Sequence, residues 1–252
     1  MQINIKNKRI LVTGSSSGIG KGILHSFNQH GALTVANSRN KDSLDESVKS
    51  YKNCFTAHGD VSIPGDAKKV VISAIDKLGG LDTLVCNVGS GVSVQPGNES
   101  YDEWIKVFHA NFFSATNVIE NSIDALSKSN GNIICISSIC GSQRIDGAPV
   151  TYSVAKSALN AYIKSISKFL GNKGIRINGI APGNILFEGS IWEKKIADNK
   201  SSVDEMLNKD VPLKMLGDLE DISNLALYIS SDKSKFLHGS VIEIDGGQTT
   251  YF

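Results

Sequence analysis

The stretch Thr13-Gly14-Ser15-Ser16-Ser17-Gly18-Ile19-Gly20 follows a short apolar run at 8–12 and precedes a helical pattern that ends at Gly31. A glycine-rich turn between a strand and a helix binds phosphate groups, because glycine lets the backbone approach a pyrophosphate and the helix N-terminus presents free N–H groups. The glycines are spaced four and two apart, a variant of the usual Gly-x-Gly-x-x-Gly. An ordinary turn is the alternative; the flanking strand and helix favour a nucleotide site.

The same alternation of strand and helix continues along the chain. Apolar runs predict further strands at 33–37, 53–57, 81–86, 133–136, 176–180 and 241–244. Periodicity predicts helices at 42–50, 65–78, 110–126, 152–170 and 218–230, and another that begins with a capping box at Ser100 and Glu103. This order indicates an α/β fold: one domain over 1–252, built as a doubly wound sheet of about seven parallel strands with helices on both faces.

The composition argues against several classes of protein. The 252 residues contain 26 Lys+Arg and 25 Asp+Glu without a block of like charge, so neither nucleic acid nor a membrane is an expected partner. The first nine residues lack a signal-peptide core, and no apolar run approaches the roughly 20 residues of a membrane span. The four cysteines form no Cys-x-x-Cys pair, so we expect free thiols, no metal site and a cytoplasmic protein.

The end of the second predicted strand bears on the choice of cofactor. In a βαβ dinucleotide site, an acid at this point binds the 2′-hydroxyl of NAD, whereas an arginine accommodates the 2′-phosphate of NADP. Here the chain reads Asn37-Ser38-Arg39, with no acid and one cation. Arg39 can hold the extra phosphate through charge-assisted hydrogen bonds. NADP(H) is therefore predicted over NAD(H), with a plain surface charge as the alternative.

Tyr152 and Lys156 open the helix predicted at 152–170. Positions four apart share a helix face, with about 5–6 Å between Cβ atoms. A nearby ammonium stabilises a phenolate and is expected to lower the phenol pKa from about 10. The pair is thus predicted to act as a general acid/base, the alternative being an ordinary half-exposed helix face.

One long stretch interrupts the alternation of elements. The segment 184–217 has a polar centre at 188–210 and contains Trp192 and Lys194-Lys195. Long segments outside the core are usually lids, binding loops or disordered. We interpret this one as a substrate lid, with an insertion that only packs on the surface as the alternative.

The residues of interest follow the predicted strands at a common end. In open α/β sheets, ligands bind outside the carboxyl ends of the strands. After the glycine turn that follows the first strand, the residues at the ends of the second to sixth strands are Arg39, Asp60, Asn87, Ser138 and Pro182. One site at this edge of the sheet is therefore predicted.

Taken together, the motifs resemble the short-chain dehydrogenase/reductase family, in its short single-domain branch. Each motif alone is weak or moderate, whereas the ordered set is specific and covers nearly the whole chain. The resemblance implies a Rossmann-type fold and an NAD(P)-dependent oxidoreductase. The matching pieces are Thr13-Gly-x-x-x-Gly-Ile-Gly20, Asp60-Val61, Asn87-x-Gly89, Asn111, Ile136-Ser-Ser138, Tyr152-x-x-x-Lys156, Pro182-Gly183 and Asp245-Gly-Gly247.

The resemblance also implies a catalytic tetrad. Tyr152 would exchange a proton with the substrate oxygen, and Ser138 would hydrogen-bond the same oxygen. Lys156 would lower the Tyr152 pKa and bind the nicotinamide ribose, and Asn111 would hold a water that links Lys156 to solvent. Hydride transfer to a carbonyl builds negative charge on oxygen, which two hydroxyl donors can meet. A plain turn serine and a structural helix asparagine are the alternatives for Ser138 and Asn111.

For the cofactor, the resemblance places the backbone of 15–20 around the phosphates, Asp60 and Val61 against the adenine, and Asn87 near the ribose. It brings the backbone of Ile185 to the nicotinamide carboxamide. The expected cofactor-binding residues are Gly14, Ser15, Ser16, Ser17, Gly18, Ile19, Gly20, Ser38, Arg39, Asp60, Val61, Asn87, Val88, Gly89, Tyr152, Lys156, Pro182, Gly183 and Ile185.

Three features depart from the family pattern. Val88 stands where alanine is common, which narrows the space near the adenosine ribose. Phe187 stands where a threonine is frequent, which puts one hydrogen bond to the cofactor amide in doubt. Ser138 lies one residue further from Tyr152 than usual, so the loop at 141–149 is expected to have a different shape beside the substrate.

Two enzymatic functions remain open on the sequence. The first is a reductase of 3-oxoacyl thioesters. The second is a reductase or dehydrogenase of a sugar or nucleotide-sugar, because the stretch 183–192 resembles relatives linked to surface-glycan and flagellin modification. Expected substrate contacts are Ser138, Phe187 and Trp192, the last stacked on a sugar ring. A non-catalytic regulator that senses NADP is the alternative from another class.

Small residues lie opposite the predicted acid/base face of the 152–170 helix, at Ala155, Ala158 and Ala161. Small side chains permit close helix approach. The resemblance implies that this helix pairs across a two-fold axis, so a homotetramer, or a homodimer, is expected.

Overall fold

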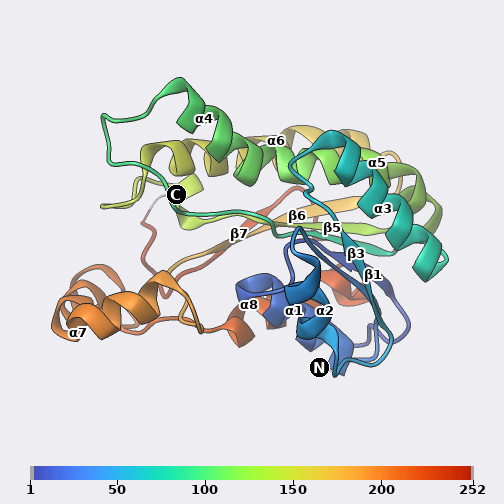
Figure 1. Cartoon of the computed structure of the whole chain (residues 1–252), viewed down its shortest axis with the longest axis horizontal. Coiled ribbons are helices and arrows are strands. Elements are labelled where there is room, and N and C mark those ends of the chain that lie inside the picture. The colour runs from blue at the N-terminus through green and yellow to red at the C-terminus, as the bar shows by residue number, and fades with distance from the viewer. Residues whose placement is uncertain (1–2, 251–252) are drawn as a thin grey trace.

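The computed structural model describes residues 3–250 and contains one sheet that takes strands from the whole length of the chain (Figure 1). All neighbouring strands pair in parallel, in the order β3-β2-β1-β4-β5-β6-β7. The chain order reverses between β1 and β4, and doubly wound sheets bind ligands at such a switch point. The strands are β1 (Arg9–Val12), β2 (Leu33–Ser38), β3 (Cys54–His58), β4 (Thr83–Cys86), β5 (Asn132–Ile136), β6 (Arg176–Pro182) and β7 (Val241–Ile244).

Helices cover both faces of the sheet, which confirms the predicted doubly wound α/β fold (Figure 1). On one face α1 packs on α8 beside α2; on the other α3 packs on α5 and α4 packs on α6. Within residues 3–250, no helix has the length and apolar character that a membrane span requires. The helices are α1 (Gly18–Gln29), α2 (Lys41–Val48), α3 (Pro64–Leu78), α4 (Tyr101–Phe108), α5 (Ser114–Ser129), α6 (Val150–Gly171), α7 (Ile191–Asp210) and α8 (Leu219–Ser230).

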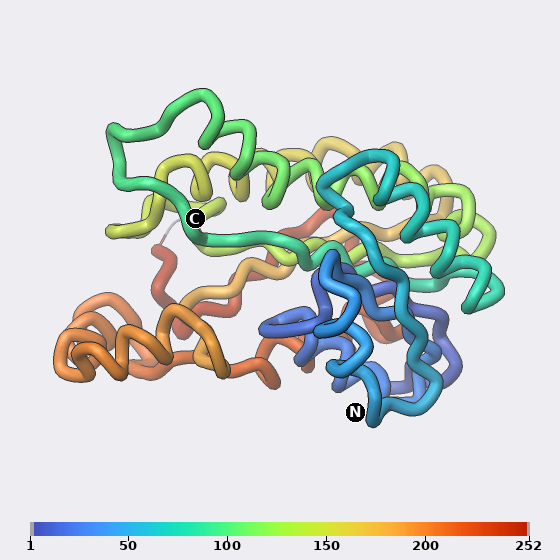
Figure 2. The backbone as a smooth tube through the Cα atoms, in the orientation of Figure 1, coloured from blue at the N-terminus to red at the C-terminus, as the bar shows by residue number. Residues whose placement is uncertain are grey.

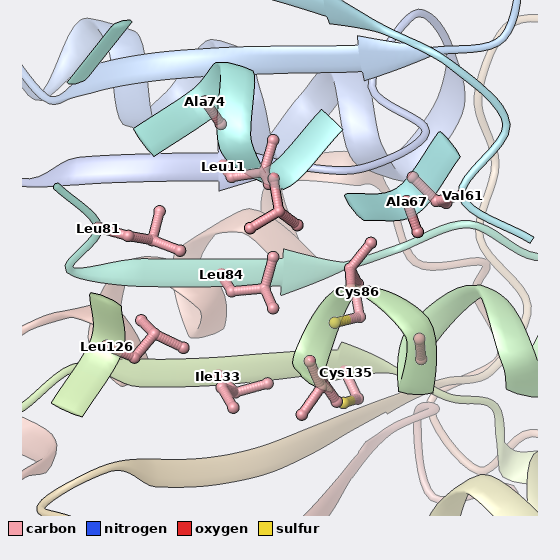
Figure 3. Close-up of a cluster of buried hydrophobic side chains, with 14 of the residues drawn as sticks. Leu11, Val61, Ala67, Ala74, Leu81, Leu84, Cys86, Leu126, Ile133 and Cys135 are labelled. Atoms are coloured by element: carbon pink, nitrogen blue, oxygen red, sulfur yellow. The ribbon is translucent and has the colours of Figure 1, made fainter. Parts of the chain in front are cut away.

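Apolar side chains fill both sides of the sheet. Leu11 of β1 belongs to the cluster under α3 and α5, whereas its neighbours Ile10 and Val12 belong to the cluster under α1 and α8. Successive side chains of a strand point to opposite faces, so burial on both faces demands a nearly continuous apolar run. Figure 3 shows part of the first cluster, with Leu84 and Ile133 projecting from neighbouring strands.

The predicted strands lie within a few residues of those observed, but two helical features differ in kind. Ser100 Oγ accepts the N–H of Glu103 at 3.2 Å, yet the Glu103 carboxylate accepts a hydrogen bond from Ser93 at 2.9 Å, so the predicted capping box is half formed. The helix predicted at 110–126 begins instead with a π-helical turn, η1 (His109–Phe113). Such a turn contains an extra residue, which hydrophobic periodicity does not reveal.

The segment 184–217 is largely helical, although no helix was predicted there. α7 contains a break at Asn199, where φ is −159° and ψ is 88°. The two ends of the segment are held together by a parallel bridge between Ile185 and Gly217. Figure 2 shows the segment as a folded unit beside the main body. Its own small core contains Val203, Leu207 and Val211, with Trp192, Ile196, Met206 and Leu216 packed against it.

Candidate active site

The glycine turn is built by close backbone approach. Gly14 and Gly18 have φ of 62° and 56°, in the left-handed region that favours glycine. A Cβ atom at Gly20 would collide with the side-chain amide of Asn87 and lie 2.5 Å from the Gly14 carbonyl oxygen. That amide donates to the carbonyls of Thr13 and Gly14, each at 3.0 Å, so Asn87 fixes the turn after β1. α1 begins at Gly18, which leaves its first N–H groups facing the turn.

The end of β2 carries hydroxyl groups and one cation. Ser16 Oγ lies 3.2 Å from Ser38 Oγ, across the mouth of the turn. The Arg39 side chain is 82% exposed, and its nearest ion-pair contact is to Asp60 at 3.9 Å. The Asp60 carboxylate accepts shorter hydrogen bonds from the N–H and hydroxyl of Ser62, at 3.0 and 2.7 Å. The guanidinium is therefore held loosely and can turn toward a phosphate beside the two hydroxyls.

A groove of about 560 Å³ runs along the carboxyl ends of the strands. Its lining takes residues from the ends of β1 to β5 and includes the glycine turn and two cations, Arg39 and Lys156, a set that fits a dinucleotide. Five predicted cofactor residues lie outside the lining, namely Ser15, Gly20, Pro182, Gly183 and Ile185. The groove brings together the other predicted ones: Gly14, Ser16, Ser17, Gly18, Ile19, Ser38, Arg39, Asp60, Val61, Asn87, Val88, Gly89, Tyr152 and Lys156.

Tyr152 and Lys156 meet at the end of this groove that lies furthest along the sheet from Arg39. Lys156 Nζ lies 5.9 Å from the centre of the Tyr152 ring and donates to the carbonyl of Ile136 at 2.8 Å. Ser138 follows β5 and is buried, and its Oγ accepts the N–H of Cys140 at 3.2 Å. Three of the four predicted tetrad residues therefore lie at the carboxyl end of β5 and the start of α6.

Asn111 reaches the same region from η1. A Cβ atom at Gly89 would lie 2.8 Å from Asn111 Oδ1 and 3.1 Å from Lys156 Nζ, so only glycine allows both groups to approach the loop after β4. Asn111 is buried, and its amide donates to the carbonyls of Ser90 and Val107 at 3.0 and 3.1 Å while accepting from the Ser90 N–H at 3.0 Å. These contacts fit the alternative that Asn111 is a structural helix asparagine. The role of Asn111 in holding a water remains a prediction.

Of the two aromatic residues predicted to contact substrate, only Phe187 lines the groove. Its ring covers Gly18, with Cε2 3.1 Å from the position of a Cβ there. Trp192 instead packs in the small core of α7, and Lys195 Nζ lies 4.4 Å from the centre of its ring. The expected sugar stacking on Trp192 is therefore not supported, because packing and Lys195 occupy that ring.

A profile of the family described as enoyl-(acyl-carrier-protein) reductase matches residues 14–249. A 3-oxoacyl-(acyl-carrier-protein) reductase of Chlamydia muridarum is 34% identical over 249 residues, which are 96% of this chain and 97% of the relative. The chain belongs to the short-chain dehydrogenase/reductase family.

Two solved structures show which ligands other members of the family hold. L-sorbose reductase from Gluconobacter frateurii, complexed with NADPH and L-sorbose, aligns with a TM-score of 0.93 and 28% identity over 100% of both chains. A 7α-hydroxysteroid dehydrogenase complexed with NADH aligns with a TM-score of 0.89 and 26% identity, over 97% of this chain and 95% of that one. As a short-chain dehydrogenase/reductase, the chain is an oxidoreductase that uses a nicotinamide cofactor, and its interpretation as a non-catalytic regulator is wrong.

Burial sets the protonation of the two central groups of this short-chain dehydrogenase/reductase. It raises the pKa of Tyr152 to about 12, against the opposing effect of a hydrogen bond with Ser138. It also lowers the pKa of Lys156 to about 8. Desolvation therefore acts in the direction opposite to the lowering expected from Lys156, whose effect on the Tyr152 pKa stays a prediction. At neutral pH Tyr152 is therefore a protonated phenol, the form that the predicted role of proton donor requires.

Some residues at the site gave no signal in the sequence. Two amides tie the C-terminal segment to the substrate edge: Gln143 Oε1 accepts the N–H of Thr250 at 3.0 Å, and Asn184 Nδ2 donates to Gln248 Oε1 at 3.0 Å. Such contacts join distant loops and have no periodic pattern. The groove lining also includes Asn37, Gly59, Ser62, Ser90, Gly91, Ala110, Ile136 and Ser137, which were not predicted as ligands.

Proposed function

We propose that the chain catalyses NADP(H)-dependent interconversion of a small, uncharged, hydroxylated carbonyl compound and its secondary alcohol. The observation that carries the reaction class is the approach of Tyr152 and Lys156 at one end of the dinucleotide groove, where Ser138, just outside the lining, forms a side-chain hydrogen bond with Tyr152. The bound cofactor supplies the hydride. Tyr152 and Ser138 direct hydroxyl groups at the carbonyl oxygen, where negative charge develops, and Tyr152 transfers the proton.

The charge around the substrate side favours an uncharged ligand. The substrate rim consists of the segments that follow β4 to β7, namely 88–106, 139–149, 184–217 and 245–250. It contains seven Lys and Arg side chains against eleven Asp and Glu side chains. Like charges repel at a cleft and slow association. A coenzyme A thioester or a nucleotide-sugar, both rich in phosphate, would therefore be disfavoured relative to a free ketose or aldose.

A panel of carbonyl compounds tests this assignment through the loss of NADPH absorbance. We expect turnover of free ketoses or other polyhydroxylated ketones with a kcat/KM that does not change with salt. Acetoacetyl-coenzyme A is expected to be a poor substrate whose kcat/KM rises with ionic strength, because salt screens repulsion over about 10 Å at 0.1 M. Efficient turnover of the thioester at low salt would favour the 3-oxoacyl reductase instead, which the 34% identical relative supports as the second candidate.

The cofactor preference rests on Arg39 and its two neighbouring hydroxyls. Arg39→Ala is expected to raise KM for NADPH by about tenfold or more, since a lost charge-assisted contact of about 1.5–3 kcal/mol corresponds to that factor. KM for NADH should stay within about twofold, because no 2′-phosphate is present. Steady-state assays with both cofactors measure the effect, and an equal change for NADH and NADPH would contradict the assigned role.

We also propose a homotetramer. The exposed faces of α4 and α6 carry large apolar side chains, Tyr101 at 78%, Ile105 at 40% and Val154 at 42% exposure, which support pairing of these helices between copies. Of the alanines predicted to take part in this pairing, Ala161 is exposed on α6. Ala155 is instead buried within its own protomer, so that part of the prediction is wrong. Light scattering should give about four times the 27.0 kDa of one chain. A monomeric mass would contradict the proposal.

A further inference from the structure

The end of β5 contacts the start of α6 on both sides of Ser137. The Ile136 carbonyl accepts a hydrogen bond from Lys156 Nζ at 2.8 Å, and Ser138 forms a side-chain hydrogen bond with Tyr152. Ser137 lies between these two contacts; it lines the cofactor groove and is 4% exposed. Its two peptide bonds are planar and carry the carbonyl on one side and the second serine on the other. A movement of Ser137 would therefore displace both contacts.

Asn160 of α6 holds Ser137. It lies one turn beyond Lys156, and residues four apart share a helix face, so Asn160 continues the row that Tyr152 and Lys156 begin. The Ser137 hydroxyl donates to Asn160 Oδ1 at 2.5 Å. The proposed reaction, as described so far, gives Asn160 no role, although it is bonded to the residue between the two contacts.

The amide of Asn160 is in turn oriented by an acid on β7. Glu243 Oε1 accepts the Ser142 hydroxyl at 2.8 Å, and Ser142 Oγ accepts a hydrogen bond from Asn160 Nδ2 at 3.4 Å. An ionised carboxylate only accepts, whereas a hydroxyl has one hydrogen to donate. Because the hydrogen of Ser142 is donated to Glu243, its oxygen accepts from the amide. The amide oxygen is thereby left to face Ser137, and the donors of this hydrogen-bond chain all point toward Glu243.

The loop that contains Ser142 rests directly on α6. A Cβ atom at Gly141 would lie 2.6 Å from the carbonyl carbon of Lys156, so a larger residue would push the loop away from the helix. The Gly141 carbonyl also accepts a hydrogen bond from Ser157 Oγ at 3.0 Å. Polar networks whose members are all paired are rigid, and hydrogen bonds in a chain strengthen one another. The loop after β5 is thus fixed to α6 while the hydrogen-bond chain is intact.

We propose that Asn160 is a positioning residue for the reaction and that Glu243 orients it through Ser142. By fixing Ser137, Asn160 keeps both neighbouring contacts with α6 in the geometry that proton transfer requires. The inference rests on the proposed function, in which Tyr152 exchanges the proton. A misplacement of about 1 Å at a reacting site costs about 10²-fold in rate, so a residue that touches no reacting atom has a measurable effect.

Asn160→Leu tests the hydrogen-bond chain, since leucine has a similar size and no amide. We expect kcat per molecule of bound NADPH to fall by about 10- to 100-fold, whereas Kd for NADPH stays within about twofold. A loss of folded protein would instead reduce the number of cofactor sites and leave the turnover of each site unchanged. The matched control is Asn121→Leu on α5, which removes a half-buried amide that donates within its own helix and should retain turnover.

Two substitutions of Glu243 separate orientation of the amide from general destabilisation. Glu243→Leu removes the acceptor, and kcat should fall by about tenfold. Glu243→Gln keeps an acceptor oxygen for Ser142 and should restore most of the turnover that Glu243→Leu loses. Because both residues act through one chain, Asn160→Leu/Glu243→Leu should be within about twofold of Asn160→Leu alone, whereas independent effects would multiply. Multiplied losses, or equal losses in the two Glu243 variants, would overturn the orienting role of Glu243.

Hydrogen exchange tests the inference without a substrate. The backbone amides of 137–142 should exchange about tenfold faster or more in Asn160→Leu than in the wild type, because their local opening costs less free energy, and Asn121→Leu should leave them unchanged. If the wild type reduces no carbonyl compound, the proposed function fails, and this measurement still decides whether Asn160 fixes the loop. If the wild type is active, equal turnover per bound NADPH in Asn160→Leu would overturn the inference and leave the proposed function standing.

Discussion

Tyr152→Phe is expected to lower kcat by about 10³-fold, within the range of about 10²–10⁴ that a positioned acid or base contributes. The ring stays in place at the end of the cofactor groove, so packing and cofactor contacts are retained, and only the proton donor is lost. Because Tyr152 is protonated in the folded protein, with a pKa raised by burial to about 12, the reduction direction should be affected most directly. Initial rates with NADPH and the best carbonyl substrate measure the loss.

The control for this variant is cofactor affinity, followed by NADPH fluorescence. Its Kd should stay within about twofold of the wild-type value, since the hydroxyl acts on the substrate and not on the phosphate groups. Ser138→Ala should give a smaller loss of kcat, because the phenol still donates to the same oxygen. A Tyr152→Phe enzyme that retains wild-type turnover would remove Tyr152 from the mechanism.

Lys156→Met is expected to abolish most activity and yet to stabilise the fold by about 1–2 kcal/mol at pH 7. Burial lowers the Lys156 pKa from 10.5 to about 8, so the charged ammonium destabilises the folded state relative to the unfolded state. A pKa shift of that size corresponds to a destabilisation of about 3 kcal/mol, which the methionine variant removes. The variant also loses the hydrogen bond to the Ile136 carbonyl, and the free energy of that bond must be subtracted. Chemical denaturation at several pH values measures the difference.

The sign of the pH dependence follows from the direction of the shift. Below about pH 8 the amine is protonated in both states, and the full penalty is present in the wild type. Between about pH 8 and 10.5 the folded state binds fewer protons than the unfolded state, so wild-type stability should rise relative to Lys156→Met. Lys168→Met, on the exposed side of the same helix, should show no such trend. A pH-independent difference would contradict the burial of a charged Lys156.

Much of the fold could be predicted because it depends on local patterns. The apolar runs of β4 and β5 are buried on both faces, and burial of that kind leaves a nearly continuous signal in the sequence. The glycine turn, Arg39 and Asn87 each follow a predicted strand, and parallel strands end at the same edge of a sheet. The topology alone therefore predicts that these residues lie at one edge. The lining of a single groove confirms that these residues lie together.

The remaining features depend on contacts between segments that are distant in the sequence. The π-turn at Asn111 is one inserted residue, and the position of Trp192 depends on how α7 packs on itself. Ala155 lies on the face of α6 opposite that predicted, because the start of this helix packs against the turn that follows Ser138. The pKa of Tyr152 depends on its burial, which spacing from Lys156 does not determine.

Transfer of deuterium from the cofactor tests the central claim most directly. With NADPH deuterated at the reactive position of the nicotinamide C4 and the best carbonyl substrate, mass spectrometry and NMR should find one deuterium on the new carbinol carbon of the product, and Tyr152→Phe should form this product only at its residual rate. A reduced product without deuterium on that carbon, or deuterium released to water, would contradict direct hydride transfer between the cofactor groove and the substrate held by Tyr152.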